Sequence, residues 1–230
     1  MAIALIPARG NSKRIPGKNI RSFHGQPIIA YSIKAALQSG CFSRVIVSTD
    51  SKDIAQVAEN FGAEVPFMRP SAIADDYSAT MEVVKHAYEW LRAETGKSPR
   101  TVCCIYATAP FVRGTDLLAS KSIFDKSKAE FIFAATEFSF PIQRGFTLDP
   151  DGCVQMVSPE LEKTRSQDLP QAYHDAGQFY WCRNSAIEQD LPIFASHSRP
   201  YLMSRNRVQD IDTFEDWDFA EKLFQVSEFG

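Results

Sequence analysis

Short apolar runs alternate with helix-like stretches over the first 135 residues, and this alternation restricts the fold more than any other feature. The runs expected to form strands are 3–6, 45–48, 65–68, 102–107 and 131–135. The segments expected to form helices between them are 27–39, 52–61, 80–94 and 116–126. These runs are apolar throughout rather than at every second position, so both faces of each strand should be buried. Together they predict an α/β fold: a Rossmann-like, mostly parallel sheet with helices on both faces.

Residues 137–173 interrupt this pattern. Helical periodicity fades there, and prolines divide the segment at Pro141, Pro150, Pro159 and Pro170. The sequence Asp149-Pro-Asp-Gly152 predicts a turn between two short extended stretches at 146–148 and 154–156. Because the segment keeps its aromatic residues, we expect an inserted hairpin and not a linker.

Regular structure is expected to resume at 178–181, followed by a strand near 201–203 and a helix from Thr213 to about Gln225. Thr213 with Asp216 three residues later predicts a capping box at the start of that helix. We therefore predict a single domain over residues 1–230, with 137–173 as an insertion within it.

Composition excludes several classes of protein. The chain has 230 residues, of which 44% are hydrophobic, and a formal net charge of −3. These values are typical of globular proteins and exclude disordered or fibrous chains. The slightly acidic balance argues against a nucleic-acid or membrane-surface binder, and no run approaches the roughly 18 apolar residues of a membrane span. Five cysteines without C-x-x-C spacing and a start without a signal peptide predict a cytoplasmic protein.

The loop that follows the first expected strand is rich in positive charge. Four basic side chains lie within ten residues: Arg9, Lys13, Arg14 and Lys18. Gly10 and Gly17 free the backbone to turn around a ligand. Such a loop, at the carboxyl end of a strand, predicts a polyphosphate site, with a solvated basic turn as the alternative. It matches neither G-x-G-x-x-G nor G-x-x-x-x-G-K-[ST], which disfavours nicotinamide-cofactor and P-loop proteins.

Two further clusters of polar residues occur late in the chain. Asp210 and Asp212 are spaced so that, on an extended stretch, both carboxylates face one side and share a hard cation such as Mg²⁺. The alternative for Asp212 is a helix cap. The second cluster contains Arg165, which could pair with an anionic group of a substrate. It also contains His174, which could act as a base, although a single histidine in a loop more often has a structural role.

A family resemblance follows from motifs along the whole chain. The start, Ile6-Pro-Ala-Arg-Gly-Asn-Ser-Lys-Arg-Ile-Pro-Gly-Lys-Asn-Ile20, closely resembles the signature of the cytidylyltransferases that activate nine-carbon acidic sugars. This family includes the CMP-sialic acid synthetases. Five more motifs fall in family order: Val47-Ser-Thr-Asp50, Glu64-Val-Pro-Phe-Met-Arg-Pro70, Ala107-Thr-Ala-Pro110, Arg165-Ser-Gln-Asp-Leu-Pro170 and Asp210-Ile-Asp-Thr213. Segments 104–111, 137–144 and 173–181 most resemble the pseudaminic acid branch.

The resemblance implies a nucleotidyltransferase type A-like fold and transfer of CMP from CTP to a 2-keto sugar acid, with Mg²⁺ as cofactor and pyrophosphate as by-product. The catalytic residues that it implies are Arg9, Lys18, Asp210 and Asp212, the two aspartates being the metal ligands. The implied nucleotide site comprises Ala8, Arg9, Gly10, Asn11, Ser12, Lys18, Asn19, Arg69, Ser78 and Thr80. The implied sugar site comprises Tyr106, Thr108, Gln143, Arg144, Arg165, Gln178 and Tyr180, with Arg165 or Arg144 on the sugar carboxylate.

The resemblance also implies partners. The expected partners are CTP, a nine-carbon 2-keto sugar acid and a second copy of the chain, with no nucleic acid and no membrane. Within this homodimer, the insertion at 137–173 would be the dimerisation region and would help to build the neighbouring sugar site. The downstream use implied is glycosylation of surface structures such as flagellin.

Two departures concern the sugar. Sialic acid enzymes typically show Gln-Pro-Thr-Ser-Pro where this chain has Tyr106-Ala-Thr-Ala-Pro110, and Asn-Gly where it has Ala176-Gly177. Both changes favour pseudaminic acid over N-acetylneuraminate. The alternatives that stay open are legionaminic acid, N-acetylneuraminate or a shorter keto-sugar acid as substrate, a uridylyl- or guanylyltransferase, and a catalytically silent nucleotide sensor.

Overall fold

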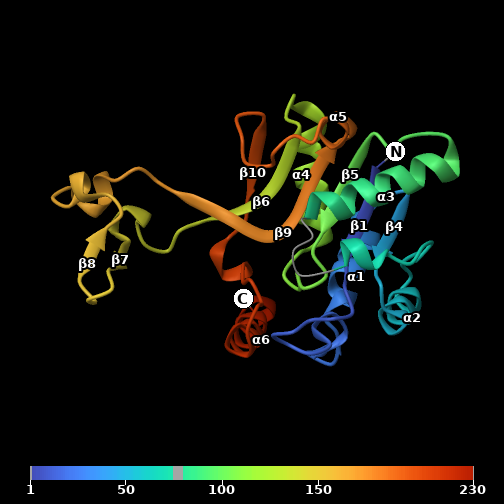
Figure 1. Cartoon of the computed structure of the whole chain (residues 1–230), viewed down its shortest axis with the longest axis horizontal. Coiled ribbons are helices and arrows are strands. Elements are labelled where there is room, and N and C mark those ends of the chain that lie inside the picture. The colour runs from blue at the N-terminus through green and yellow to red at the C-terminus, as the bar shows by residue number, and fades with distance from the viewer. Residues whose placement is uncertain (1, 75–79, 230) are drawn as a thin grey trace.

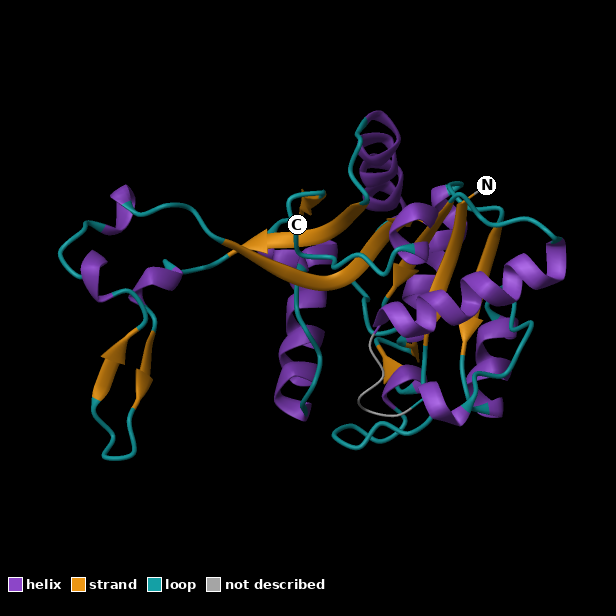
Figure 2. Ribbon diagram, turned by 45° about the horizontal axis from the view of Figure 1, so that its top comes forward, coloured by secondary structure: helices purple, strands orange, loops and turns teal. Residues whose placement is uncertain are grey.

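A six-stranded sheet forms the centre of the molecule in the computed structural model, which describes residues 2–74 and 80–229 (Figures 1 and 2). The strand order is β10-β6-β9-β5-β1-β4. Only β9 runs antiparallel to its neighbours in this sheet, β5 and β6. The strands span Ala2–Pro7 (β1), Arg44–Ser48 (β4), Thr101–Ile105 (β5), Phe131–Glu137 (β6), Tyr173–Arg183 (β9) and Ser198–Leu202 (β10). The predicted α/β fold with a mostly parallel sheet is therefore confirmed.

Both faces of the sheet are covered by helices. In β1, Ala4 and Ile6 belong to one apolar cluster, whereas Ile3 and Leu5 belong to another on the opposite face. The first cluster lies under α1 (Ile29–Ser39), α2 (Lys52–Asn60) and α4 (Gly114–Lys126). The second lies under α3 (Thr80–Thr95) and the short α5 (Asn184–Glu188). Burial on both faces is why the strands are apolar at every position.

A third apolar cluster joins the two ends of the chain. It packs Ile15 and Phe23, from the segment after β1, against Ile211 and Trp217 near α6 (Phe214–Phe229). The predicted capping box is present, since Thr213 Oγ1 accepts from the Asp216 amide at 3.2 Å and the Asp216 carboxylate accepts from the Thr213 amide at 2.8 Å. This cluster holds the residues around Ile211 beside the basic loop.

The start of α1 differs from the expectation. Two short strands, β2 (Ser22–Phe23) and β3 (Gln26–Pro27), form a tight hairpin, and α1 begins only at Ile29. His24 and Gly25, at its turn, have φ of 44° and 85°. Positive φ at both central positions is what the type I′ turn of a two-residue hairpin requires. Pro27 therefore lies in the hairpin and not in the first turn of the helix.

Three other elements differ from the expectation. Segment 65–68 forms no named strand and contributes only the isolated bridge of Thr49 with Met68, beside that of Ile46 with Glu64. Strand β9 begins at Tyr173, before the expected 178–181, and the five-residue α5 has too few residues to show a helical period. No helix in the two described ranges combines the length and apolar character needed to cross a membrane.

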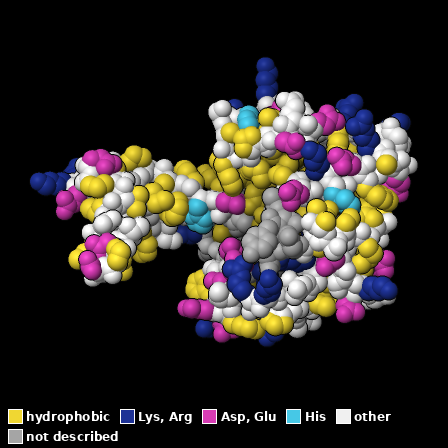
Figure 3. Space-filling view, viewed as in Figure 1, with side chains coloured by type: hydrophobic (Ala, Val, Ile, Leu, Met, Phe, Trp, Pro, Cys, Tyr) yellow, Lys and Arg dark blue, Asp and Glu magenta, His cyan; other side chains and the backbone are white. Residues whose placement is uncertain are grey.

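The insertion forms an arm that projects from the sheet, seen on the left of Figures 1 and 2. Its strands, β7 (Phe146–Leu148) and β8 (Val154–Met156), lie where the sequence predicts them, and they pair antiparallel. Asp149 Oδ1 closes the turn by accepting from the amides of Asp151 and Cys153 at 3.0 and 2.8 Å. Figure 3 shows hydrophobic side chains exposed along the arm.

Candidate active site

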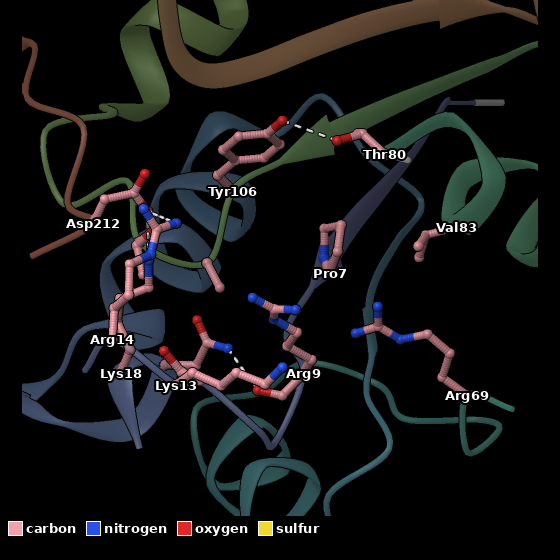
Figure 4. Close-up of a pocket in the computed structure, with 14 residues that line it drawn as sticks. Pro7, Arg9, Lys13, Arg14, Lys18, Arg69, Thr80, Val83, Tyr106 and Asp212 are labelled. Carbon is pink, nitrogen blue, oxygen red and sulfur yellow. Dashed lines mark hydrogen bonds and ion pairs between the residues drawn. The ribbon is translucent and has the colours of Figure 1, made fainter. Parts of the chain in front are cut away.

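A cavity of about 520 Å³ opens beyond the carboxyl ends of β1 and β5 (Figure 4). This is the edge where ligands bind in doubly wound α/β folds. The loop after β1, the residues after β5, the start of α3 and the strand-like segment before α6 contribute to the wall. The lining residues are Pro7, Arg9, Ser12, Lys13, Arg14, Lys18, Asn19, Arg69, Thr80, Val83, Tyr106, Ala107, Thr108 and Asp212.

The loop is folded by contacts of its own backbone. The Gly10 amide donates to Asp50 Oδ1 at 2.7 Å, and Asn19 Nδ2 donates to the Arg9 carbonyl at 2.9 Å. A Cβ added at Gly10 would stand 2.9 Å from Cβ of Ser51, so the loop comes closer to α2 than a side chain allows. The loop is therefore fixed by specific contacts and is not a loosely solvated turn.

Lys18 and Arg14 converge on one carboxylate. Lys18 Nζ donates to the Ile211 carbonyl at 2.6 Å and lies 3.4 Å from Asp212 Oδ1. Arg14 Nη2 lies 2.9 Å from the same oxygen. The predicted basic loop and the predicted acidic pair are thus brought together at one wall of the cavity.

Ile211, which stands between Asp210 and Asp212, is buried in the third apolar cluster. Partial burial and the nearby Asp212 carboxylate raise the pKa of Asp210. Gly177 of β9 comes so close that a Cβ there would be 4.0 Å from Asp210 Oδ1.

The donor set fits a magnesium ion that also binds substrate phosphate. Mg²⁺ usually takes one or two carboxylates and completes its shell with water and phosphate oxygens. Among the described residues, no group of three or more His, Cys, Asp or Glu side chains is placed to hold a metal. Asp210 and Asp212 supply two carboxylates, the number that such an ion usually takes from a protein; burial first, and then the Asp212 charge, raise the pKa of Asp210.

Arg69 forms the floor of the cavity. Its side chain is buried, and its Nη2 donates to the Ser48 carbonyl at 2.8 Å, while Nε is buried without a hydrogen-bond partner among the residues that the structure describes. Burial lowers the pKa of the guanidinium. Thr80 lines the same cavity from the start of α3, and its hydroxyl is 2.9 Å from that of Tyr106.

The remaining predicted nucleotide residues divide into three groups. Ser12 lines the cavity, and Asn11 is exposed in the loop beside it. Ala8 is buried, and its amide donates to the Ser48 carbonyl at 2.9 Å, so it positions the loop through its backbone. Ser78 lies outside the described residues.

The predicted sugar residues are not all brought together. Tyr106 and Thr108 line the cavity, while Gln178 and Tyr180 lie behind it in β9. Gln178 is fully buried, and within the described part of the chain neither polar atom of its side-chain amide has a hydrogen-bond partner. The other three belong to the arm and bond within it: Gln143 to the Pro170 carbonyl, Arg144 to the carbonyls of Glu162 and Thr164, and Arg165 to Asp168.

A second cavity of about 390 Å³ lies on the other side of the acidic pair. Asp210, His174 and Asp175 contribute to its lining, together with Arg205. Sequence reasoning missed Asp175, although it is adjacent to the Ala176-Gly177 pair on which the sugar preference was argued. The two aspartates of the acidic pair therefore line different cavities, Asp212 the first and Asp210 the second.

Comparison with known proteins agrees with this arrangement. A sequence model of a family described as cytidylyltransferase matches residues 3–227. The chain belongs to this cytidylyltransferase family. The matched range contains both the loop after β1 and the acidic pair. The cavity that this loop and Asp212 line is therefore the candidate active site of a nucleotidyltransferase.

Individual relatives extend over nearly the whole chain. The pseudaminic acid cytidylyltransferase of Campylobacter jejuni is 45% identical over 98% of this chain and 97% of its own length. The CMP-N,N'-diacetyllegionaminic acid synthase of Legionella pneumophila is 32% identical over 98% of this chain and 97% of its own. A solved CMP:2-keto-3-deoxy-manno-octonic acid synthetase complexed with CTP shares the fold, with a TM-score of 0.70 at 16% identity over 98% of this chain and 99% of the other.

Proposed function

We propose that this cytidylyltransferase transfers CMP from CTP to pseudaminic acid and releases pyrophosphate. The observation that carries the proposal is the meeting of Lys18 and Arg14 with Asp212 at the mouth of a cavity that Arg9 and Arg69 also line. A polyphosphate requires such a set of positive charges. The 45% identity to the Campylobacter jejuni enzyme supports pseudaminic acid as the sugar.

The reaction is an in-line displacement at the α-phosphorus of CTP. The anomeric hydroxyl oxygen of the sugar acid forms the new bond to phosphorus, the bond to the bridging oxygen breaks, and pyrophosphate leaves with that electron pair. The hydroxyl proton is released to solvent. Positioning and neutralisation of charge dominate such a transfer, which matches a cavity lined by the cations of Arg9, Lys18 and Arg69.

Each part of the cavity has a task in this reaction. Arg9 and Lys18 would hold the triphosphate, and the Lys18 ammonium would exchange its contact with Ile211 for phosphate oxygens. Arg69 and Thr80, at the far wall, would meet the cytidine. With the cytidine at Arg69 and Thr80, the α-phosphorus of CTP would lie between the loop after β1 and the acidic pair.

Asp210 and Asp212 would hold Mg²⁺ in this reaction. When bound, the ion would neutralise phosphate charge and lower the pKa of the attacking hydroxyl. Because Asp212 lines the nucleotide cavity and Asp210 the second cavity, the pair stands between the two places where the substrates would lie. The second cavity is thus our candidate for part of the sugar site.

We also propose that the enzyme is a homodimer. Phe146 and Leu148 on β7 face the same side as their partners on β8, Met156 and Val154, and Phe146, Leu148 and Val154 are exposed by 58–63%. A two-stranded hairpin with one apolar face is marginal until that face is covered. A second copy of the chain is the proposed cover, and the sugar residues on the arm, Arg144 and Arg165 among them, would then serve the partner's site.

The cellular setting is part of the proposal. All five cysteines are free, which suits a reducing compartment such as the cytoplasm. The product would serve the glycosylation of surface structures such as flagellin.

The experiment that tests the function is pyrophosphate release measured with four nucleoside triphosphates crossed against a panel of nonulosonic acids. We expect turnover with CTP and pseudaminic acid, and little with ATP, GTP or UTP. The 32% identity to the Legionella pneumophila synthase makes legionaminic acid the second candidate sugar, so it belongs in the panel. Turnover with another nucleotide at equal efficiency would contradict the proposal.

A further inference from the structure

The second cavity is acidic, although the sugar acid proposed for it is an anion. Glu137, Asp175 and Asp210 line it with three carboxyl groups. Arg205 is the one described residue lining this cavity whose side chain carries a permanent positive charge. A sugar acid brings one more negative charge into these surroundings, and a buried or half-buried charge needs a partner of opposite sign. Arg205 is thus the residue of this cavity that can neutralise an anionic substrate.

The guanidinium of Arg205 is exposed and uncommitted. In the part of the chain that the structure describes, its side chain has neither an ion pair nor a hydrogen bond. The two arginines expected at the sugar have partners within the arm. Arg165 Nε donates to Asp168 Oδ2 at 2.8 Å, and Arg144 Nη1 donates to the Glu162 carbonyl at 2.6 Å. Arg205 can therefore bind a ligand without giving up a contact.

The backbone around Arg205 is fixed on both sides. Before it, the Met203 carbonyl accepts from Thr136 Oγ1 at 2.9 Å. After it, Arg207 donates to both carboxylate oxygens of Asp116 at 2.9 Å, and Asp116 is only 4% exposed. A bidentate pair of this kind sets orientation as well as distance. The uncommitted guanidinium is thus carried by a segment held to the sheet and to α4.

The structure of a 2-keto sugar acid restricts where its carboxylate can lie. The carboxylate carbon is bonded to the anomeric carbon, and the hydroxyl on that carbon is the group that attacks CTP. The carboxylate therefore reaches the site beside the attacking oxygen, close to the acidic pair. Arg205 lines the same cavity as Asp210. It also lines a smaller cavity of about 240 Å³ at the root of the arm, where β6 ends and β9 begins (Figure 1).

We propose that Arg205 binds the carboxylate of the sugar acid and so selects an acidic sugar as the acceptor of CMP. The planar guanidinium offers two parallel N–H donors that match the two oxygens of a carboxylate. This inference rests on the proposed function and names the residue that recognises the charged group of the substrate. It assigns the carboxylate to the chain that also supplies the acidic pair, and it leaves Arg144 and Arg165 of the arm to other groups of the sugar.

The test compares pseudaminic acid with its methyl ester, which lacks the negative charge and keeps the rest of the sugar. With CTP, the wild type should have a kcat/KM for the acid at least about tenfold above that for the ester. In Arg205→Gln, kcat/KM for the acid should fall roughly ten- to hundredfold, while that for the ester stays within about threefold. The KM for CTP should stay within about twofold, since the loop after β1 is untouched.

The preference for the acid over the ester separates a contact with the carboxylate from a structural role, because a structural defect slows both substrates alike. Arg199→Gln is the matched control, since Arg199 is an exposed arginine of β10 that lines neither the first nor the second cavity. This variant should match the wild type with both substrates. Arg165→Gln, on the arm, should keep the preference for the acid.

Three results would overturn the proposal. They are a wild type that uses the ester as well as the acid, an Arg205→Gln enzyme that prefers the acid as strongly as the wild type, and loss of the preference in Arg165→Gln alone. The last result would assign the carboxylate to the arm.

A second variant keeps the test decisive if Arg205→Gln does not fold. Arg205→Lys keeps the charge, but a single ammonium cannot make the paired contact, so the preference for the acid should fall by about threefold or more. An unchanged preference in that variant would contradict the proposal. A wild type without turnover of any nonulosonic acid would refute the proposed function, whereas an active wild type with an unchanged preference in the variants refutes only the role of Arg205.

Discussion

Lys18 and Asp212 meet at the mouth of the nucleotide cavity although 194 positions separate them in the chain. The third apolar cluster brings them together, because Ile15 in the loop and Ile211 beside Asp212 are both buried in it. In the structure the acidic segment supplies the counter-charge and the carbonyl acceptor for the ammonium group. Binding of CTP would exchange these partners for phosphate oxygens, so the loop is held in place before the substrate arrives.

The first prediction concerns this ammonium group. Lys18→Ala should lower kcat/KM for CTP roughly ten- to hundredfold, the range for losing one charge-assisted contact to phosphate. Arg9→Ala should do the same. Steady-state kinetics on variants with a wild-type circular dichroism spectrum are the measurement, and Lys128→Ala, a change at an exposed lysine outside the site, is the control. Full activity in Lys18→Ala would show that the loop does not bind the triphosphate.

The second prediction concerns the divalent ion. Chelation by EDTA should abolish turnover, and added Mg²⁺ should restore it. Asp212→Asn should raise the Mg²⁺ concentration that gives half-maximal activity by about tenfold or more, since one of two charged ligands becomes neutral. Asp218→Asn, on the exposed side of α6, should leave that concentration unchanged. Undiminished turnover in EDTA would contradict the metal assignment.

The third prediction concerns pH and stability. The ring of His86 packs edge-on against Phe67 with centroids 5.1 Å apart, and its burial, then the charge of Arg69, lowers its pKa below 6.5. The unfolded chain binds this proton at about pH 6.5, so unfolding takes up a proton as the pH falls below that value. The free energy of unfolding should therefore decrease between pH 7.5 and 5.5. Urea denaturation should show a smaller decrease for His86→Gln, and an equal decrease in both proteins would be contrary evidence.

The sequence predicted most of the fold because the decisive signals are local. Apolar runs buried on both faces of a sheet are visible as such, and Asp149 with Gly152 marks its turn without help from the rest of the chain. The hairpin at His24 and Gly25 was missed because histidine is not among the residues that favour positive φ most strongly. Segment 65–68 was wrongly predicted as a strand, since it contributes a single isolated bridge, of Met68 with Thr49, instead of a ladder.

The candidate site was predicted in its parts but not in its arrangement. Spacing predicted that Asp210 and Asp212 face one side, and the position after the first strand predicted that the basic loop lies at the ligand edge, where it lines the first cavity. That Lys18 reaches Ile211 depends on packing between the two ends of the chain, which no local pattern encodes. Asp175 was missed for the same reason. It lines the second cavity next to an irregularity in the pairing of β6 with β9, which no local pattern predicts.

The fourth prediction concerns the arm. Phe146→Asp combined with Leu148→Asp should convert the proposed dimer to a monomer, because both charges enter the apolar face of the hairpin. Thr147→Asp places one charge on the opposite face and should leave the dimer intact. Sedimentation velocity over a range of concentrations is the measurement. A wild-type chain that sediments as a monomer at every concentration would show that the exposed face has another purpose.

The fifth prediction concerns the choice of sugar. Pseudaminic acid should be used at least about tenfold better than N-acetylneuraminate, because Tyr106 and Ala176 stand where sialic acid enzymes place two amide side chains. The structure shows why neither residue can replace such an amide. The hydroxyl of Tyr106 is engaged with Thr80, and Ala176 is buried beside the second cavity, so neither offers the paired donor and acceptor of an amide.

Tyr106→Gln restores one of these amides and should narrow the gap between the two sugars, mainly by lowering turnover of pseudaminic acid. The ratio of kcat/KM for pseudaminic acid to that for N-acetylneuraminate should be very large only where a polar group of N-acetylneuraminate is buried without a partner. Otherwise the ratio should be about 10–200, the range for a difference of one methylene-sized group. The measurement is kcat/KM for both sugars with CTP on one enzyme preparation. Equal values in the wild type would place the enzyme with those that activate sialic acids, while leaving the cytidylyl transfer itself unaffected.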